Sequence, residues 1–156
     1  MFGIYRDSLN KNIFGDILTF FHNWQYFCKP LRENNKNLYI LTNASDFHTQ
    51  RVTKQLGIDV LFDEVFTLED TGLIPKPKKK YFDLAQAKIG MDYSDSIFFE
   101  DSSHNLVTAK YLGMTTVLIH ADDEKSAINF YDNEEIDYYA KDVESFFKGE
   151  YIATRK

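Results

Sequence analysis

The feature that most constrains the fold is the stretch Leu38–Ser45, which reads LYILTNAS. It begins as an apolar run without alternating polar residues and then changes to hydroxyl and amide side chains at Thr42 and Asn43. A continuous apolar run is typical of a strand that is covered on both faces, as in a parallel sheet. The polar residues that follow therefore predict a turn leading from this strand into a helix.

Similar apolar runs recur from Asn37 onward and alternate with longer amphipathic segments. This alternation is typical of a parallel sheet covered by helices, and the β-branched and aromatic residues of the runs favour strands. We therefore predict an α/β fold, a Rossmann-like parallel sheet with helices on both faces, as the core domain over residues 37–156. The predicted strands are Leu38–Leu41, Glu64–Leu68, Ile97–Phe99, Thr115–Ile119 and a weaker run, Ile136–Tyr139.

Apolar residues at helical spacing predict helices between these strands. We expect Asp46 to cap the first helix, which carries Val52 and Leu56 and stops at Gly57. The further helices are expected over Tyr81–Ile89 before Gly90, over Leu106–Leu112 before Gly113, after Ala121 with Ile128 and Phe130, and after a capping Asp142 with Val143 and Phe146–Phe147.

Residues 1–36 follow a different pattern and form a separate helical segment in this interpretation. Their apolar side chains predict an amphipathic helix over Ile13–Phe27. Cys28 is the single cysteine of the chain, which excludes an intramolecular disulfide and a cysteine-based metal site. Its aromatic neighbours favour a buried thiol.

The net charge of −6 limits the partners that the chain can bind. It disfavours nucleic acid and anionic membranes, and it requires a local cation or metal ion if the substrate is an anion. No apolar run approaches the roughly 20 residues of a membrane span, and charged residues interrupt the N-terminus too early for a signal peptide. These features predict a cytoplasmic protein.

Polar and charged residues occur at three places where a small anion could bind. Thr42 and Asn43 follow one predicted strand, Glu100 and Asp101 follow another, and Lys76 lies in the segment IPKPKKKYF. Ligands of open α/β sheets bind at the carboxyl ends of strands, where a turn entering a helix presents N–H groups to phosphate oxygens. Adjacent carboxylates repel each other unless a cation neutralises them, and Mg²⁺ prefers carboxylate oxygens. The sequence therefore predicts a site for a small phosphorylated molecule and Mg²⁺.

Each of these residues also has an ordinary structural explanation. Thr42 and Asn43 can form a turn or cap a helix, Lys76 can be a surface lysine, and Glu100–Asp101 can cap the next helix. Residues 78–80, three consecutive lysines, are expected in an exposed first helical turn, although cations there oppose the helix dipole. The four histidines form no ligand cluster in sequence, and neither a glycine-rich phosphate loop nor a Gly-x-Ser-x-Gly motif occurs.

Taken together, these segments resemble a known family. Thr42 in ILTNAS, Lys76 in LIPKPKKKYF and Glu100–Asp101 in FFEDSSHNL are similar to the second, third and fourth motifs of the haloacid dehalogenase (HAD) superfamily, in the same order. The resemblance covers about Leu38 to Ile119. Within the superfamily, the longer stretches TNASDFHTQRVTKQLGIDVLFDEVF and FFEDSSHNLVTAKYLGMTTVLI are similar to the pyrimidine 5′-nucleotidase branch.

This resemblance implies a Mg²⁺-dependent phosphatase that hydrolyses a phosphomonoester, with a pyrimidine nucleoside 5′-monophosphate as the expected substrate. In that family an aspartate attacks phosphorus, the threonine donates a hydrogen bond to a phosphoryl oxygen, and the lysine neutralises the nucleophile and the transferring group. The resemblance assigns catalytic roles to Thr42 and Lys76, substrate binding to Asn43, and Mg²⁺ binding to Asp101, Glu100 and Asn105.

The chain departs from the family at its first motif. The nucleophile should lie in an Asp-x-Asp sequence after an apolar strand, and no such sequence precedes Thr42. Asp7 in FGIYRD is the nearest substitute, but it has no acidic residue two positions away. In the family that strand lies between the strands ending at Thr42 and Glu100. Without it, those strands would pair directly or leave backbone groups unpaired.

We therefore interpret the chain as the C-terminal part of such a phosphatase, with residues 1–36 as a remnant of the helical cap and the return to the core. An in-frame Asp-x-Asp-x-Thr upstream of the Met1 codon is expected, and the chain alone is not expected to hydrolyse an aryl phosphate. Two alternatives stay open. The chain can be a catalytically inactive module that binds phosphate or metal, or a sugar-phosphate phosphatase or phosphomutase of the same superfamily.

Overall fold

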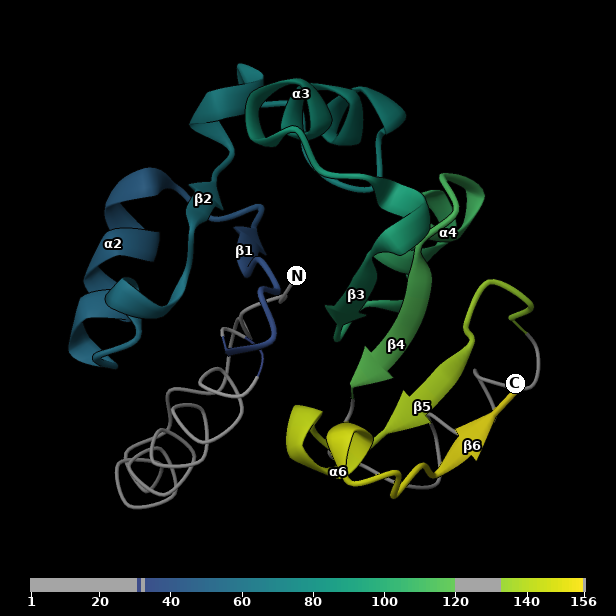
Figure 1. The fold of residues 1–156 in the computed structure, drawn as a ribbon. Helices are drawn as coiled ribbons and strands as arrows, with labels where there is room; N and C mark the ends of the chain where they lie inside the picture. Colours follow the sequence, from purple (N-terminus) through teal and green to yellow (C-terminus); the bar gives the residue numbers. More distant parts are fainter. Residues whose placement is uncertain (1–30, 32, 120–132, 156) are drawn as a thin grey trace.

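The computed structural model describes residue 31 and residues 33–119 and 133–155. Several expectations lie outside these residues: the helix over Ile13–Phe27, the Cys28 thiol, Asp7, and the helix with Ile128 and Phe130. Within the described residues, strands and helices alternate along the chain (Figure 1). This arrangement confirms the predicted α/β fold class.

The described residues form two sheets whose strands are mostly parallel. One sheet contains β1 and β2 in parallel, and the other has the order β3-β4-β5-β6. In the second sheet β3, β4 and β5 are parallel, whereas β6 is antiparallel to β5 and was not predicted. The strands are β1 (Tyr39–Leu41), β2 (Glu64–Phe66), β3 (Ile97–Glu100), β4 (Thr115–Ile119), β5 (Tyr138–Ala140) and β6 (Ala153–Thr154).

One predicted strand is displaced, because β5 starts at Tyr138 and not at Ile136. The side chain of Asp137 explains the shift. Its carboxylate accepts hydrogen bonds from the backbone N–H of Thr116 at 3.1 Å and from the ammonium of Lys110 at 2.6 Å. The chain before Tyr138 is thus held on β4 by these side-chain contacts and by one backbone hydrogen bond, from the Asp137 N–H to the Thr116 carbonyl at 3.2 Å, and regular strand pairing begins at Tyr138.

Four helices of the described residues carry labels in Figure 1: α2 (Asp46–Gln55), α3 (Lys79–Ile89), α4 (Ser103–Tyr111) and α6 (Val143–Phe147). The prediction that Asp46 caps α2 is wrong by one residue. Ser45 has an extended backbone and its hydroxyl accepts the N–H of His48, so Asp46 is the first helical residue. The capping role of Asp142 at α6 is confirmed. Gly90 ends α3 with a φ of 74°, a conformation that favours glycine.

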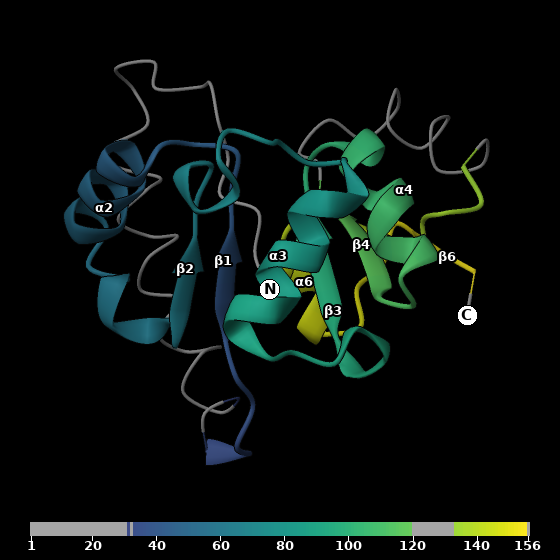
Figure 2. The ribbon, with the colours of Figure 1, turned by 90° about the horizontal axis from the view of Figure 1, so that it is seen from above.

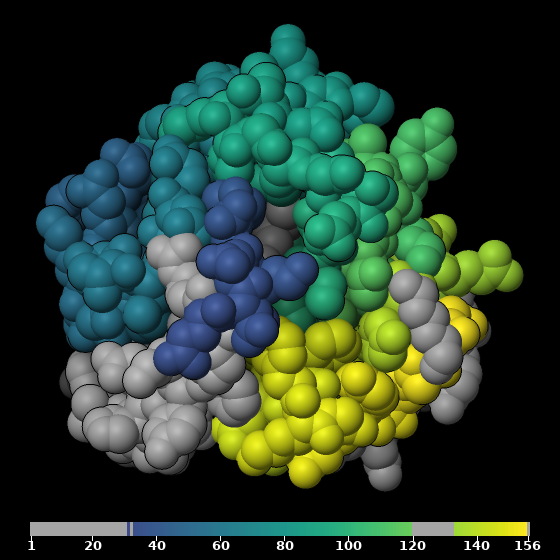
Figure 3. Space-filling model, in the orientation of Figure 1, coloured from purple at the N-terminus to yellow at the C-terminus, as the bar shows by residue number. Residues whose placement is uncertain are grey.

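Successive residues of each strand face opposite sides of the sheets and enter two separate cores. Leu41, Phe98 and Leu118 belong to the core under α3 and α4, whereas their neighbours Ile40 and Phe99 belong to the core that contains Phe146 of α6. Both faces are therefore covered, as the continuous apolar runs predicted. In the space-filling view the C-terminal part of the chain, in yellow, lies directly against green parts of the chain (Figure 3).

β1 and β3 are not paired with each other in the described part of the chain. Helix α3 lies over the boundary between the two sheets, as two perpendicular views show (Figures 1 and 2). Tyr81 of α3 donates hydrogen bonds to the β1–β2 sheet, and the Phe82 ring packs edge-on against Phe98 of β3 at 6.1 Å. Helix α3 therefore connects the two sheets, and the direct pairing of the strands before Thr42 and Glu100 does not occur within these residues.

None of the helices in the described segments combines the length and the apolar character that crossing a lipid bilayer requires.

Candidate functional site

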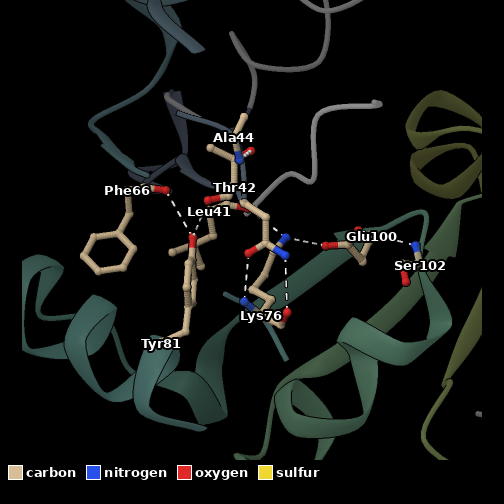
Figure 4. A network of polar contacts seen from close by, with 9 residues as sticks. Leu41, Thr42, Ala44, Phe66, Lys76, Tyr81, Glu100 and Ser102 are labelled. Carbon is tan, nitrogen blue, oxygen red and sulfur yellow. Dashed lines mark hydrogen bonds and ion pairs between the residues drawn. The ribbon is translucent and has the colours of Figure 1, made fainter. Parts of the chain in front are cut away.

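The carboxyl ends of β1 and β3 meet at the ammonium group of Lys76. Its Nζ donates to the carbonyl oxygen of Leu41, the last residue of β1, at 2.9 Å. The same Nζ lies 2.5 Å from Oε2 of Glu100, the last residue of β3 (Figure 4). The structure thus brings together three segments that are far apart in the sequence.

Lys76 and Glu100 form an ion pair that is almost completely shielded from solvent. Each side chain is only 4% exposed, and the Lys76 Nζ also lies 5.1 Å from the centre of the Phe98 ring. The explanation of Lys76 as an ordinary surface lysine is therefore wrong. Two buried charges persist only when they are paired and hydrogen-bonded, which both groups are here.

Thr42 acts as a turn former and keeps a hydrogen-bond donor for other use. Its Oγ1 accepts the backbone N–H of Ala44 at 3.0 Å, which shapes the turn between β1 and α2. Its backbone N–H donates to Phe66, and its carbonyl oxygen accepts from the Tyr81 hydroxyl at 3.0 Å. A hydroxyl that accepts one hydrogen bond still has its own proton to donate. The ordinary and the functional interpretation of Thr42 are therefore compatible.

The carboxamide of Asn43 contacts the backbone of Lys76 on two sides. Its Oδ1 accepts the Lys76 N–H at 2.8 Å, and its Nδ2 donates to the Lys76 carbonyl at 3.3 Å. Asn43, which was expected to bind substrate, is thus hydrogen-bonded to the backbone of Lys76, which was expected to neutralise the transferring group. The sequence carried no signal for this contact, because it joins positions 33 residues apart.

The carboxyl groups of Glu100 and Asp101 titrate in opposite directions. Burial favours the neutral form of Glu100, but the charge of Lys76 and hydrogen bonds from Asp101, Lys76 and Asn105 outweigh it and lower the Glu100 pKa. Burial, followed by the hydrogen bond and negative charge of Glu100, raises the pKa of Asp101 to about 7. The Lys76 ammonium therefore neutralises the Glu100 carboxylate, and the Asp101 carboxyl group lacks an equivalent partner charge.

The residues at this edge fit Mg²⁺ better than a transition metal. No group of three His, Cys, Asp or Glu side chains that could hold a metal ion occurs within the described residues, and His48 and His104 join none. Mg²⁺ is commonly held by one or two protein carboxylates together with water and substrate oxygens. Asp101, with Glu100 and the Asn105 carboxamide beside it, offers such an oxygen-rich set, and a cation there would offset the burial and the negative charge that raise the Asp101 pKa.

Three helices begin at the same edge of the sheets. α2 starts five residues after β1, α4 starts three residues after β3, and α3 starts three residues after Lys76. Helix N-termini carry partial positive charge and free N–H groups, so helices that begin at this edge favour a bound anion there. The exposed position of residues 78–80 at the start of α3 confirms the prediction for these lysines.

Tyr81 is the site residue that sequence reasoning missed. Its hydroxyl donates to the carbonyl oxygens of Thr42 and Phe66 at 3.0 and 3.1 Å (Figure 4). It thereby fixes the backbone on which the Thr42 side chain stands. The helical spacing marked Tyr81 only as a core residue, and no local pattern distinguishes a buried tyrosine with this contact from a buried phenylalanine.

Comparison with known proteins places the chain in a family. Residues 1–119 match the family of haloacid dehalogenase-like hydrolases. Pyrophosphatase PpaX of Bacillus velezensis is 28% identical over 116 residues, which are 74% of this chain and 53% of that protein.

Two solved structures share the fold. A HAD phosphatase of Thermococcus onnurineus is 27% identical with a TM-score of 0.62, covering 78% of this chain and 53% of its own. The HAD hydrolase YfnB of Bacillus subtilis, bound to magnesium, is 21% identical with a TM-score of 0.63, covering 80% of this chain and 52% of its own. The present chain spans about half the length of each of these three proteins.

Proposed function

Because the chain belongs to the haloacid dehalogenase-like hydrolase family, we propose that its site binds a phosphoryl group in the Mg²⁺-dependent hydrolysis of a phosphate ester. The observation that supports this most strongly is the buried Lys76 ammonium, held between the last residues of β1 and β3 and joined to Thr42 through Leu41. A fixed, desolvated cation at the edge of the sheets where these helices begin is suited to stabilise charge that develops on phosphoryl oxygens.

The described residues have different roles in such a site. Thr42 donates a hydrogen bond from its hydroxyl to a phosphoryl oxygen, and Lys76 neutralises the transferring group. Asp101, with Glu100 and Asn105, would hold Mg²⁺, and the metal ion would supply further positive charge to the phosphoryl oxygens. Within the described part of the chain, Glu100 is the one carboxylate that forms an ion pair with Lys76. Asp7, the nearest substitute for the family's nucleophile in the sequence, lies outside the described residues.

Two substrate classes are proposed for this site. The resemblance of the segments around Thr42 and Glu100 to the pyrimidine 5′-nucleotidase branch supports a pyrimidine nucleoside 5′-monophosphate. The similarity to a protein named as a pyrophosphatase supports inorganic pyrophosphate. Both present a terminal phosphoryl group to the same cation and hydroxyl. The proposal includes a cytoplasmic location and excludes nucleic acid and membranes as partners.

A second candidate function is a module that binds phosphate and Mg²⁺ without turnover. The absence of an Asp-x-Asp sequence before Thr42 favours it, because the family's nucleophile has no match there. The same Thr42, Lys76 and Asp101 groups would then hold the anion and the metal ion without a covalent step.

A panel of phosphate-release assays in Mg²⁺ separates these functions. The panel contains UMP, CMP, a sugar phosphate, pyrophosphate and an aryl phosphate. If the chain is a hydrolase, Lys76→Ala should lower kcat by on the order of 10²-fold, whereas Lys79→Ala, which removes an exposed lysine, should leave kcat unchanged. Phosphate binding that depends on Mg²⁺ without release is the result expected of the binding module and also of the C-terminal part of a phosphatase, and it argues against turnover by this chain. The absence of both binding and release contradicts the proposed site.

A further inference from the structure

We infer that Asn43 is a positioning residue that acts through Lys76 and does not itself bind the phosphoryl group. The inference deepens the proposed function and rests on it for one of its two tests. Its basis is the pair of hydrogen bonds from one carboxamide to both backbone polar groups of Lys76, at 2.8 and 3.3 Å.

The orientation of the Asn43 carboxamide follows from its partners. Its oxygen faces the Lys76 N–H, a donor, and its nitrogen faces the Lys76 carbonyl, an acceptor. A carboxamide turned by 180° would oppose two donors and two acceptors. The contact therefore fixes the plane of the side chain and leaves one of its N–H groups and one oxygen lone pair for other partners.

The effect of this contact is to fix the point from which the Lys76 side chain extends. A lysine side chain has four flexible carbons, so its ammonium is placed precisely only if the backbone and the far end are both held. Asn43 holds the backbone, and Leu41 and Glu100 hold the Nζ.

Asn43 also links Lys76 to Thr42, because the two residues are adjacent in the turn after β1. Tyr81, five residues beyond Lys76, returns a hydrogen bond to the Thr42 carbonyl. Contacts thus run in both directions between the segments 41–43 and 76–81. The Thr42 hydroxyl and the Lys76 ammonium are presented by one connected structure, which preorganises the two groups toward a common ligand.

The alternative role for Asn43 is direct binding of the anion through its remaining N–H group. A double-mutant cycle with inorganic phosphate as the probe separates the two roles. The full chain is titrated calorimetrically with phosphate at saturating Mg²⁺, as wild type, Asn43→Ala, Lys76→Gln and the double variant. If Asn43 acts through Lys76, Asn43→Ala weakens binding at least tenfold in the wild type and adds less than twofold in Lys76→Gln. An equal loss in both backgrounds overturns the inference.

Gln86→Ala is the matched control. It removes another carboxamide that donates to a backbone carbonyl at 3.3 Å, that of Met91, at the opposite end of α3. This variant should lose some stability and keep the wild-type affinity for phosphate. If it weakens phosphate binding as much as Asn43→Ala does, the effect of Asn43 is general destabilisation and the inference fails.

The second test needs no ligand and therefore stands even if the proposed function fails. The Lys76 ammonium protons, buried between Leu41 and Glu100, should exchange slowly enough to be observed by ¹H–¹⁵N NMR at neutral pH. The signal should persist in Gln86→Ala and disappear or broaden in Asn43→Ala. An unchanged signal in folded Asn43→Ala shows that Asn43 does not position the lysine. If the wild type does not bind phosphate but Asn43→Ala still loses this signal, the proposed function is rejected and the positioning role of Asn43 is retained.

Discussion

At the scale of single residues, burial distinguishes the Lys76–Glu100 pair from the other ion pairs of the described residues. The Lys79–Asp83 pair has the same N···O separation of 2.5 Å, but its side chains are 58% and 47% exposed. Exposed pairs contribute little because water and salt screen them, whereas a buried charge that loses its partner is strongly destabilising. The two pairs therefore allow the effect of burial to be compared at the same N···O separation.

We expect Glu100→Leu to reduce the free energy of unfolding by about 3 kcal/mol, since it leaves the Lys76 ammonium buried without a counter-charge. Asp83→Leu should change stability by less than about 0.5 kcal/mol. Urea denaturation of both variants at neutral pH provides the comparison. Similar losses in the two variants would show that the Lys76–Glu100 pair is not shielded from water as the structure has it.

Asp101 gives the site a dependence on pH. Its pKa rises from 3.8 to about 7 in the folded protein, so the folded protein keeps a proton that the unfolded chain has already lost between these values. Stability from this group is therefore complete below about pH 4 and declines as the pH rises through about 7. Replacing the ionisable carboxyl group of Asp101 should abolish this decline in stability.

In the presence of EDTA, Asp101→Asn should be more stable than wild type at pH 8 by about 1–2 kcal/mol. The full pKa shift corresponds to a larger difference in the free energy of unfolding, but the Asp101 carboxyl group is only partly buried. The difference should vanish near pH 4, and Mg²⁺ should reduce it at pH 8 by stabilising the wild type. Urea titrations at pH 4, 6 and 8 test this, and a difference that is the same at all three pH values contradicts it.

At the scale of elements, α3 begins with an arrangement that is unfavourable for a helix. Lys78 is its N-cap without a side-chain hydrogen bond, and its first turn contains no acidic residue. By contrast, Ser45 caps α2 and Asp142 caps α6. Cations at a helix N-terminus oppose the dipole, and an N-cap without an acceptor leaves an N–H group unpaired.

Lys78→Asp should therefore stabilise the protein by about 1 kcal/mol, through a side-chain cap and a better charge at the start of α3. Lys54→Asp is the control with the opposite sign, because Lys54 is exposed in the last turn of α2, where a cation is favourable. Both values come from thermal or urea denaturation. A loss of stability in Lys78→Asp would mean that Lys78 makes a favourable contribution that capping does not explain.

The elements that the sequence predicted well are those whose signals are local. β4 has the predicted limits, and Gly90 and Asp142 mark helix ends as expected. The start of β5 was missed because it depends on Asp137 contacts with distant residues. β6 was missed because a strand of two residues carries no periodic pattern.

The same distinction between local signals and long-range contacts applies to the site. The sequence placed Thr42 and Glu100 correctly at strand ends, since apolar runs end visibly before polar residues. It gave no sign of the Asn43 and Tyr81 hydrogen bonds, which join segments 33 and 39 residues apart. Such contacts are decided by packing between elements, so only the folded structure reveals them.

At the scale of the whole molecule, the proposed site lies where the two sheets of the described residues come together. Thr42 and Asn43 extend from β1, Glu100 and Asp101 extend from β3, and Lys76 bonds to the last residue of both strands. Helix α3 supports this junction from one face through Tyr81 and Phe82. Any ligand held by groups from both sheets should therefore stabilise the fold as a whole.

The most direct test of this account is the calorimetric affinity for inorganic phosphate, measured with and without Mg²⁺ for the wild type, Lys76→Gln and Asp101→Asn. If groups from both sheets hold one anion together with a metal ion, phosphate binds the wild type only in Mg²⁺. Each substitution should then weaken that binding at least tenfold, Lys76→Gln by loss of the cation and Asp101→Asn by loss of the metal ligand. Wild-type binding without Mg²⁺, or unchanged affinity in both folded variants, would contradict the shared site.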